Sequence, residues 1–232
     1  MNQGFVKFPM WESRVIKMLS SILCLISPNL PIGGFSYSQA LESFVETGEI
    51  CNAQTFKSYL KHNLKRSIAK ADLPLLIRLY KSDLREFEFW TNKTLAFRNT
   101  KELRDEEINK GKALVRVIKS LKLENSSSYL EIANKSYLSA FALFSRSKKI
   151  SLNQMLESYC FSYIESQCIA AIKLVPIGQT DAWQIIDEFS NLIDEQIQTA
   201  LSVDDFHIGS GLVNLSILSV LHETQYSRIF RS

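Results

Sequence analysis

Apolar residues recur at steps of three and four along most of this chain, and no segment alternates apolar and polar residues. The strongest stretch lies at residues 152–172, with apolar positions Leu152, Met155, Leu156, Tyr159, Cys160, Tyr163, Ile164, Ile169 and Ile172. This spacing follows the turn of an α-helix. Only eight glycines and five prolines interrupt the 232 residues. We therefore predict an all-α fold over residues 1–232, a single-domain bundle of roughly eight to ten helices, with residues 1–12 flexible.

Capping residues divide the first half of the chain. A first helix runs from about Val15 and ends at Ser27-Pro28, because the residue before proline disfavours helical backbone. Ser36 with Gln39 forms a capping box, which predicts a second helix from Tyr37 to about Glu46. Asn52 is the expected cap of a third helix reaching about Lys70, and Asp72 before Leu73-Pro74 starts a fourth.

Similar signals divide the second half. Asp83 with Glu86 predicts a helix to Arg98, and Thr100 precedes the charged helix KELRDEEINKGKALVRVIKSL. A linker is expected at residues 125–128. Ser128 with Glu131 and Ser151 with Gln154 cap the next two helices, and a further helix runs from Asp181 to about Ser202.

Charge and hydropathy exclude two classes of partner. The net charge is only +3, and the basic stripe Lys57, Lys61, Lys65, Arg66 and Lys70 has the spacing of a solvated helix face, so no nucleic acid is expected. The apolar run at residues 18–27 is too short to span a bilayer and lacks a cleavage site. No membrane association is expected, and we predict a cytoplasmic protein.

The four cysteines show neither a disulfide pattern nor zinc spacing, and we expect buried free thiols. Cys160 and Cys168 stand two helical turns apart and could share a face. Because both fall on the apolar stripe of their helix, core packing is favoured over metal binding.

The sequence lacks three motifs that would bind a phosphate or a metal ion. Gly111-Lys112 is followed by Ala113 and has Glu106 where a phosphate-binding loop needs glycine, so Gly111 is a glycine within a helix. His222-Glu223 has Tyr226 in place of the second zinc-binding histidine, and Asp204-Asp205 lacks a further carboxylate one turn on. We therefore predict no catalytic residues, no metal site and no bound cofactor.

Two segments stand out instead. The first is SPNLPIGGFSYSQALE, residues 27–42, here called the Pro-Gly corner. Its prolines fix the backbone and its glycines allow positive φ, which predicts a rigid turn that leaves Gln39, Glu42 and backbone amides available. The second is HETQYSRIFRS, residues 222–232, here called the tail. Its aromatic and arginine side chains, including Phe230, are typical of interface hot spots, whereas the alternative is a frayed end packed on its own bundle.

These two segments, with FRNTKELRDEEINKGKAL and LVPIGQTDAWQ between them, resemble the urease accessory protein UreF family. The resemblance implies an all-α homodimer that assembles with the H/D-type accessory protein and the G-type GTPase. That complex acts on apo-urease during nickel insertion, with nickel and GTP handled by the partners. It also implies a partner-binding tail and a functional face on the corner. The expected partner-binding residues are Pro31, Gly33, Gly34, Ser36, Ser38, Glu42, Tyr226, Arg228, Phe230 and Arg231.

The sequence leaves two alternatives to a passive adaptor. One is a regulator that alters the turnover of the partner GTPase. The other is a helical metal-dependent enzyme, which would need carboxylate clusters that the motif searches do not find.

Overall fold

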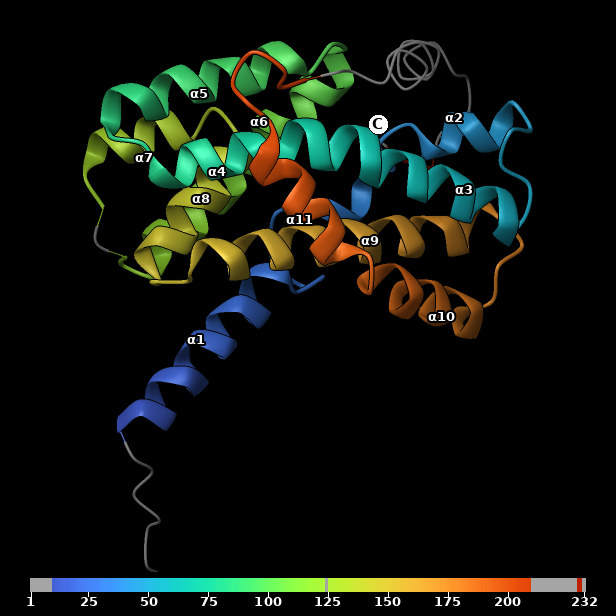
Figure 1. The fold of residues 1–232 in the computed structure, drawn as a ribbon, viewed down its shortest axis with the longest axis horizontal. Coiled ribbons are helices and arrows are strands. Elements are labelled where there is room, and N and C mark those ends of the chain that lie inside the picture. The colour runs from blue at the N-terminus through green and yellow to red at the C-terminus, as the bar shows by residue number, and fades with distance from the viewer. Residues whose placement is uncertain (1–9, 124, 210–228, 231–232) are drawn as a thin grey trace, which may run out of the picture.

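The computed structural model describes residues 10–123, 125–209 and 229–230, and in these ranges all regular structure is helical, without a β-strand (Figure 1). The α-helices are α1 (Met10–Ile26), α2 (Leu41–Glu46), α3 (Ala53–Asn63), α4 (Leu73–Lys81), α5 (Leu84–Phe97), α6 (Lys101–Ser120), α7 (Ser127–Ala133), α8 (Tyr137–Ser147), α9 (Leu152–Leu174), α10 (Gln179–Ser190) and α11 (Ile193–Ser202). A 3₁₀ turn (Gly34–Ser36) precedes α2, and a π-helix (Leu64–Asp72) joins α3 to α4. The prediction of an all-α fold is confirmed.

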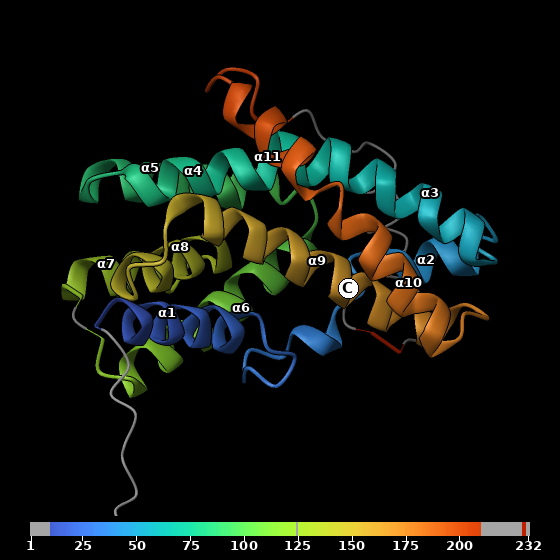
Figure 2. The ribbon, with the colours of Figure 1, turned by 60° about the horizontal axis from the view of Figure 1, so that its bottom comes forward.

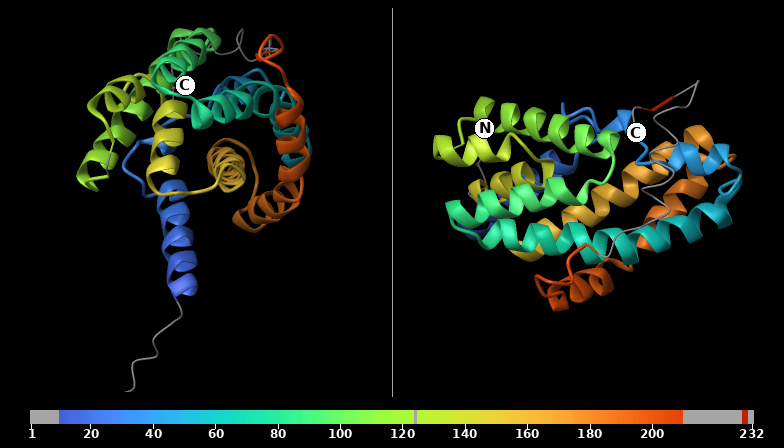
Figure 3. Two further views of the ribbon diagram at one scale, coloured as in Figure 1. Left: turned by 60° about the vertical axis from the view of Figure 1, so that its left-hand side comes forward. Right: turned by 90° about the horizontal axis from the view of Figure 1, so that it is seen from above.

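Helix α9, which the apolar periodicity predicted, runs through the middle of the bundle (Figure 3). It contacts α10 and α11 along one side and α1, α2 and α4 along others. Helix α8 is the second buried element: every residue from Tyr137 to Ser145 is buried, and α4, α6 and α7 pack around it. None of the helices in the described ranges is long and apolar enough to cross a membrane.

Helix α1 is the exception to this packing. Its C-terminal end packs on α9 through the buried Leu25, whereas the rest of the helix projects beyond the bundle (Figures 1 and 3). Val15, Ile16, Leu19 and Leu23 are therefore exposed.

Two predicted capping boxes are present, Asp83 with Glu86 at α5 and Ser151 with Gln154 at α9. Asn52 caps α3 as predicted. Thr100, which directly precedes α6, caps that helix through a hydrogen bond from the Leu103 amide at 3.3 Å. These caps can be recognised in the sequence because each one depends only on residues three positions apart.

The predicted break at Asp72 is wrong. Asp72 has helical φ and ψ, and α3, the π-helix and α4 follow one another without interruption. The eleven α-helices of the described ranges therefore form ten separate rods. Pro74 has no N–H for the Lys70 carbonyl, and the Gly209 amide donates to that carbonyl instead at 2.9 Å. The Asp72 carboxylate is used in side-chain contacts described below.

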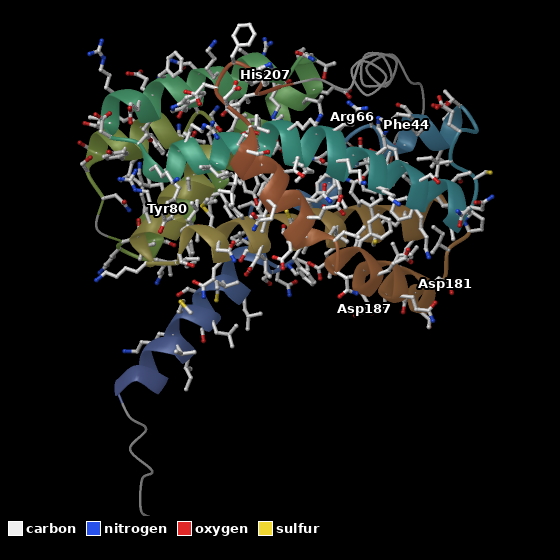
Figure 4. All side chains as sticks on the ribbon, in the orientation of Figure 1. Phe44, Arg66, Tyr80, Asp181, Asp187 and His207 are labelled. Carbon is white, nitrogen blue, oxygen red and sulfur yellow. The ribbon has the colours of Figure 1, made fainter. Side chains whose placement is uncertain are left out.

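Three further boundaries also differ from the prediction. Ser126, not Ser128, caps α7, and Ser136 caps a separate helix, α8, where one helix was expected. The helix predicted over 181–202 is likewise two helices, because α10 ends at Ser190 and α11 begins at Ile193. Asp181, labelled on α10 in Figure 4, lies within the first turn and accepts the Gly178 amide at 3.4 Å.

Helices α6 and α8 meet at Gly111. A Cβ atom at this position would lie 2.6 Å from the carbonyl carbon of Ser136 and 2.9 Å from the nitrogen of Tyr137. Only glycine allows α6 to come so close to the first turn of α8. The interpretation of Gly111 as a helix glycine is confirmed, and its role is close packing.

Two of the four cysteines are buried and two are exposed. Cys160 and Cys168 are buried in α9, and burial raises the pKa of each thiol to about 12. Cys24 and Cys51 are exposed, so the expectation of buried thiols is wrong for these two. Cys24 lies near the C-terminal end of α1, and Cys51 lies just before α3.

Candidate functional site

The Pro-Gly corner folds differently from the predicted helix start. Gly33 has φ +71°, and Gly34–Ser36 forms a single 3₁₀ turn. The chain is then extended at Tyr37, and Ala40 has φ +67°, so α2 begins only at Leu41. Ser36 does not cap α2, and this part of the prediction is wrong.

The positive φ of Gln39 (+54°) is held by two contacts. Its side-chain amide donates to Glu106 Oε1 at 3.0 Å, and its carbonyl accepts the Tyr59 hydroxyl at 3.3 Å. These bonds tie the corner to α6 and α3 and stabilise a backbone conformation that a non-glycine residue rarely adopts.

Ser38, rather than Ser36, contacts the first turn of α2, whose N-cap residue is Ala40. Its hydroxyl oxygen accepts the Glu42 amide at 3.4 Å, and its carbonyl accepts the Leu41 amide at 3.2 Å. The Gln167 side chain on α9 also donates to the Ser38 carbonyl, at 3.3 Å. Ser38 is consequently fully buried, at the point where the corner meets the core.

Glu42 connects the corner with the tail. One carboxylate oxygen accepts the backbone N–H of Ile229 at 2.7 Å, and the other accepts that of Phe230 at 3.0 Å. The Phe230 side chain is buried, and Lys173 Nζ of α9 lies 5.3 Å from its ring centroid. Hydrogen bonds to an ionised carboxylate are stronger than those between neutral groups, so Glu42 is a firm anchor for these two residues.

The predicted site residues are thus only partly at the surface. Pro31 is exposed, and Gly33, Gly34 and Ser36 are half-buried, whereas Ser38, Glu42 and Phe230 are buried. The expectation that Glu42 is available on the surface is wrong, because its side chain holds residues 229–230. Tyr226, Arg228 and Arg231 lie outside the described residues. Partner binding by these residues stays a prediction.

A cluster of buried charges lies behind the corner. Arg98 at the end of α5 forms ion pairs with Asp72 at 2.8 Å and with Glu107 at 2.9 Å. Asp72 accepts the Tyr159 hydroxyl at 2.6 Å. Glu107 accepts the Ser136 hydroxyl at 2.6 Å and the Leu138 amide at 2.9 Å, and so holds the start of α8.

These contacts determine how the groups titrate. Burial alone would raise the pKa of Glu107, but the charge of Arg98 and the hydrogen bonds from Ser136 and Leu138 outweigh burial and lower it. This cluster was not predicted from the sequence. The sequence feature that could have indicated it is the position of Glu107, which precedes Gly111, Leu114 and Ile118 at helical steps and so lies on the buried stripe of α6.

Two small cavities, of about 90 and 120 Å³, flank one polar wall between the corner and α9. The wall consists of Gln39, Glu106, Lys110, Tyr137, Tyr159 and Tyr163. Lys110 pairs with Glu106 at 3.2 Å and lies 4.2 Å from the Tyr137 ring centroid. Burial raises the pKa of the three tyrosines, which stay protonated at neutral pH. Of the three, Tyr159 donates its hydroxyl hydrogen to Asp72.

The Asp204-Asp205 pair is engaged in local contacts. Asp204 Oδ1 lies at hydrogen-bond distance, 2.8 Å, from Nδ1 of His207, and the hydrogen bonds with His207 lower the pKa of the Asp204 carboxyl. Asp205 pairs with Arg78 at 2.9 Å, and the loop presents His207 at one edge of the bundle (Figure 4). Across the residues that the structure describes, no group of three or more histidine, cysteine, aspartate or glutamate side chains could hold a metal ion.

The sequence matches one family model and many characterised proteins. The UreF family model matches residues 50–190, more than half of the chain. The urease accessory protein UreF of Alcanivorax borkumensis is 40% identical over 220 residues, covering 90% of this chain and 95% of that protein. The UreF proteins of Alkalilimnicola ehrlichii and Klebsiella pneumoniae are both 37% identical, covering 100% and 91% of this chain and 98% and 96% of their own lengths.

Proposed function

Because this chain belongs to the UreF family of urease accessory proteins, we propose that it acts as an adaptor in urease maturation. It joins the H/D-type accessory protein to the G-type GTPase during nickel insertion into apo-urease. The chain is not itself an enzyme and binds no cofactor of its own, since nickel and GTP are handled by the partners. It works in the cytoplasm as a homodimer.

The contact between Glu42 and the tail is the observation that best supports this role. It brings residues from the two ends of the sequence into one surface, where Phe230 is a buried anchor and Ile229 remains 65% exposed. Anchoring part of a segment before it meets a partner reduces the entropy lost on binding. The corner and residues 229–230 together therefore provide a preorganised surface for assembly.

Partner capture tests this proposal. Phe230→Ala removes the buried ring, and we expect capture of the accessory partners to weaken by about tenfold or more, as for a hot-spot residue. Phe206→Ala is the matched control, because Phe206 is 91% exposed in the loop after α11 and the substitution is the same. Deletion of residues 222–232 should abolish capture and leave the helical circular dichroism nearly unchanged.

Each outcome has a distinct meaning. If the full-length chain captures neither the H/D-type protein nor the G-type GTPase, alone or together, the adaptor proposal is wrong. GTP hydrolysis measured in the same mixtures separates an adaptor, which leaves the rate unchanged, from a regulator of the GTPase. Equal loss with Phe230→Ala and Phe206→Ala would show that capture does not depend on the anchored tail.

A further inference from the structure

The Pro-Gly corner and α6 lie next to each other in the ribbon (Figure 2). Residues of both line an open groove. One wall is the corner backbone at residues 31–33, and the other is α6 together with Asn134 after α7. The groove is lined by Pro31, Ile32, Gly33, Tyr37, Asn109, Lys112, Ala113, Arg116 and Asn134. It adjoins the first cavity, with which it shares Ile32 and Tyr37, and it includes neither Glu42 nor Phe230.

The charge of this groove is entirely positive. Lys112 and Arg116 are both exposed and stand one helical turn apart on α6, and no acidic residue lines the groove. Two other cations of the same helix are paired, Lys101 with Asp105 and Lys110 with Glu106. Among the described residues neither Lys112 nor Arg116 has an ion-pair partner.

This arrangement is unfavourable for the isolated helix. Like charges four residues apart on a helix repel each other and destabilise it. Beside the two cations lie an apolar floor at Ile32 and Ala113 and the side-chain amides of Asn109 and Asn134. A surface with positive charges beside apolar and amide groups fits an extended peptide that carries carboxylates.

We propose that this groove binds an acidic segment of a partner protein, with Lys112 and Arg116 each engaging one carboxylate. The inference rests on the proposed adaptor function and names the chemistry of a second contact surface next to the corner. Cβ atoms one helical turn apart are about 6 Å apart, which suits two neighbouring carboxylates rather than a single one.

Three other occupants fit less well. The residues outside the described ranges carry carboxylate side chains only at Glu124 and Glu223, too few for an acidic segment of this chain. A second copy related by a two-fold axis through the groove would face it with its own cations. A free phosphate is held best at a helix N-terminus, and α6 begins at Lys101, about 16 Å along the helix from Lys112.

Charge reversal tests the proposal. The variant K112E/R116E inverts the groove, and K112A/R116A removes its charge without adding repulsion. The matched control K119E/K122E makes the same change in net charge at two exposed residues near the end of α6, outside the groove. The dissociation constants of the full-length variants for each purified accessory partner are measured at about 0.05 M and about 0.5 M salt, because screening is strong at the higher value.

We expect K112E/R116E to weaken binding of one partner by about tenfold or more at low salt, with K112A/R116A intermediate and the control within about twofold of wild type. The difference should shrink at high salt. If wild type binds a partner and K112E/R116E binds it equally well at both salts, the groove proposal is wrong while the adaptor function stands. If the reversal instead changes only self-association, the occupant is a second copy and the proposal is again wrong.

A second measurement uses no partner protein, so it tests the groove even if the adaptor function proves wrong. A glutamate-rich peptide titrated into the isotope-labelled full-length protein should shift the backbone resonances of α6 around Lys112 and Arg116, and a lysine-rich peptide of equal length should not. No shift with the acidic peptide, or an equal shift with inorganic phosphate, would overturn the inference.

Discussion

Replacing Gly111 with alanine sets two effects of known size against each other. In an exposed helix interior, alanine is favoured over glycine by about 1 kcal/mol. At Gly111, however, the added Cβ would lie 2.6 Å from the Ser136 carbonyl carbon and 2.8 Å from its oxygen. Both are backbone atoms, so no side chain can rotate away. Reaching an ordinary contact requires α6 and α8 to separate by roughly 0.8 Å, and overpacking of this kind costs about 1–3 kcal/mol.

The separation also strains the bonds that hold the start of α8. Glu107 accepts the Ser136 hydroxyl at 2.6 Å and the Leu138 amide at 2.9 Å, and both bonds cross the same interface. A hydrogen bond to a charged group contributes about 1.5–3 kcal/mol, so partial loss of these bonds adds about 2 kcal/mol. After the gain in helix propensity is subtracted, we expect Gly111→Ala to lower the free energy of unfolding by about 3 kcal/mol.

Urea denaturation followed by circular dichroism measures this effect, with a lower midpoint and an unchanged slope as the expected result. Gly178→Ala is the control, because Gly178 has φ −72° and the added Cβ meets only the Asp181 carboxylate, at 3.4 Å. Its free energy of unfolding should change by less than about 1 kcal/mol. A Gly111→Ala protein as stable as wild type would refute the close-packing argument.

Three further predictions concern the core. Glu107→Gln should lower the free energy of unfolding by about 3 kcal/mol at pH 7, because it leaves Arg98 short of one buried partner. The folded-state pKa of Glu107 is below its ordinary value of 4.5, so its contribution is present above that pH and is lost as the pH falls through the lowered value. Denaturation midpoints of Glu107→Gln should therefore fall less steeply in acid than those of wild type. A thiol reagent at pH 8 should label the two exposed cysteines of the native protein quickly, and Cys160 and Cys168 only after unfolding, as counted by mass spectrometry. Ser151→Ala, which removes the cap of α9, should cost about 1 kcal/mol in a thermal melt, and an unchanged melting temperature would contradict the capping argument.

The sequence predicted those features of the fold that depend on neighbouring residues. The boxes at Asn52, Asp83 and Ser151 close within one turn, and the apolar stripe of α9 is local, so both are visible in the sequence. The predicted helix start at Asp72 was wrong because an aspartate carboxylate can either cap a helix or form a buried ion pair. Its partner Arg98 is 26 residues away, and no local pattern links the two.

The candidate site shows the same division. The corner and the tail were identified from composition, but their contact was not, because it joins a side chain on α2 to backbone amides near the end of the sequence. The conformations of Gln39 and Ala40 also depend on distant groups, Glu106 and Tyr59, which hold a positive φ that the sequence gives no reason to expect.

The bonds between Glu42 and the amides of Ile229 and Phe230 can form only late in the synthesis of the chain. They join residues 187 and 188 positions apart, so Glu42 leaves the ribosome well before either amide exists. At synthesis rates of about 5–20 residues per second, that interval is roughly 10–40 seconds. Helices α2 to α11 can be made within it, whereas the bonds to Glu42 form only once residue 230 has been added. A chain cut short before residue 229 therefore lacks this contact even though helices α2 to α11 have already been made.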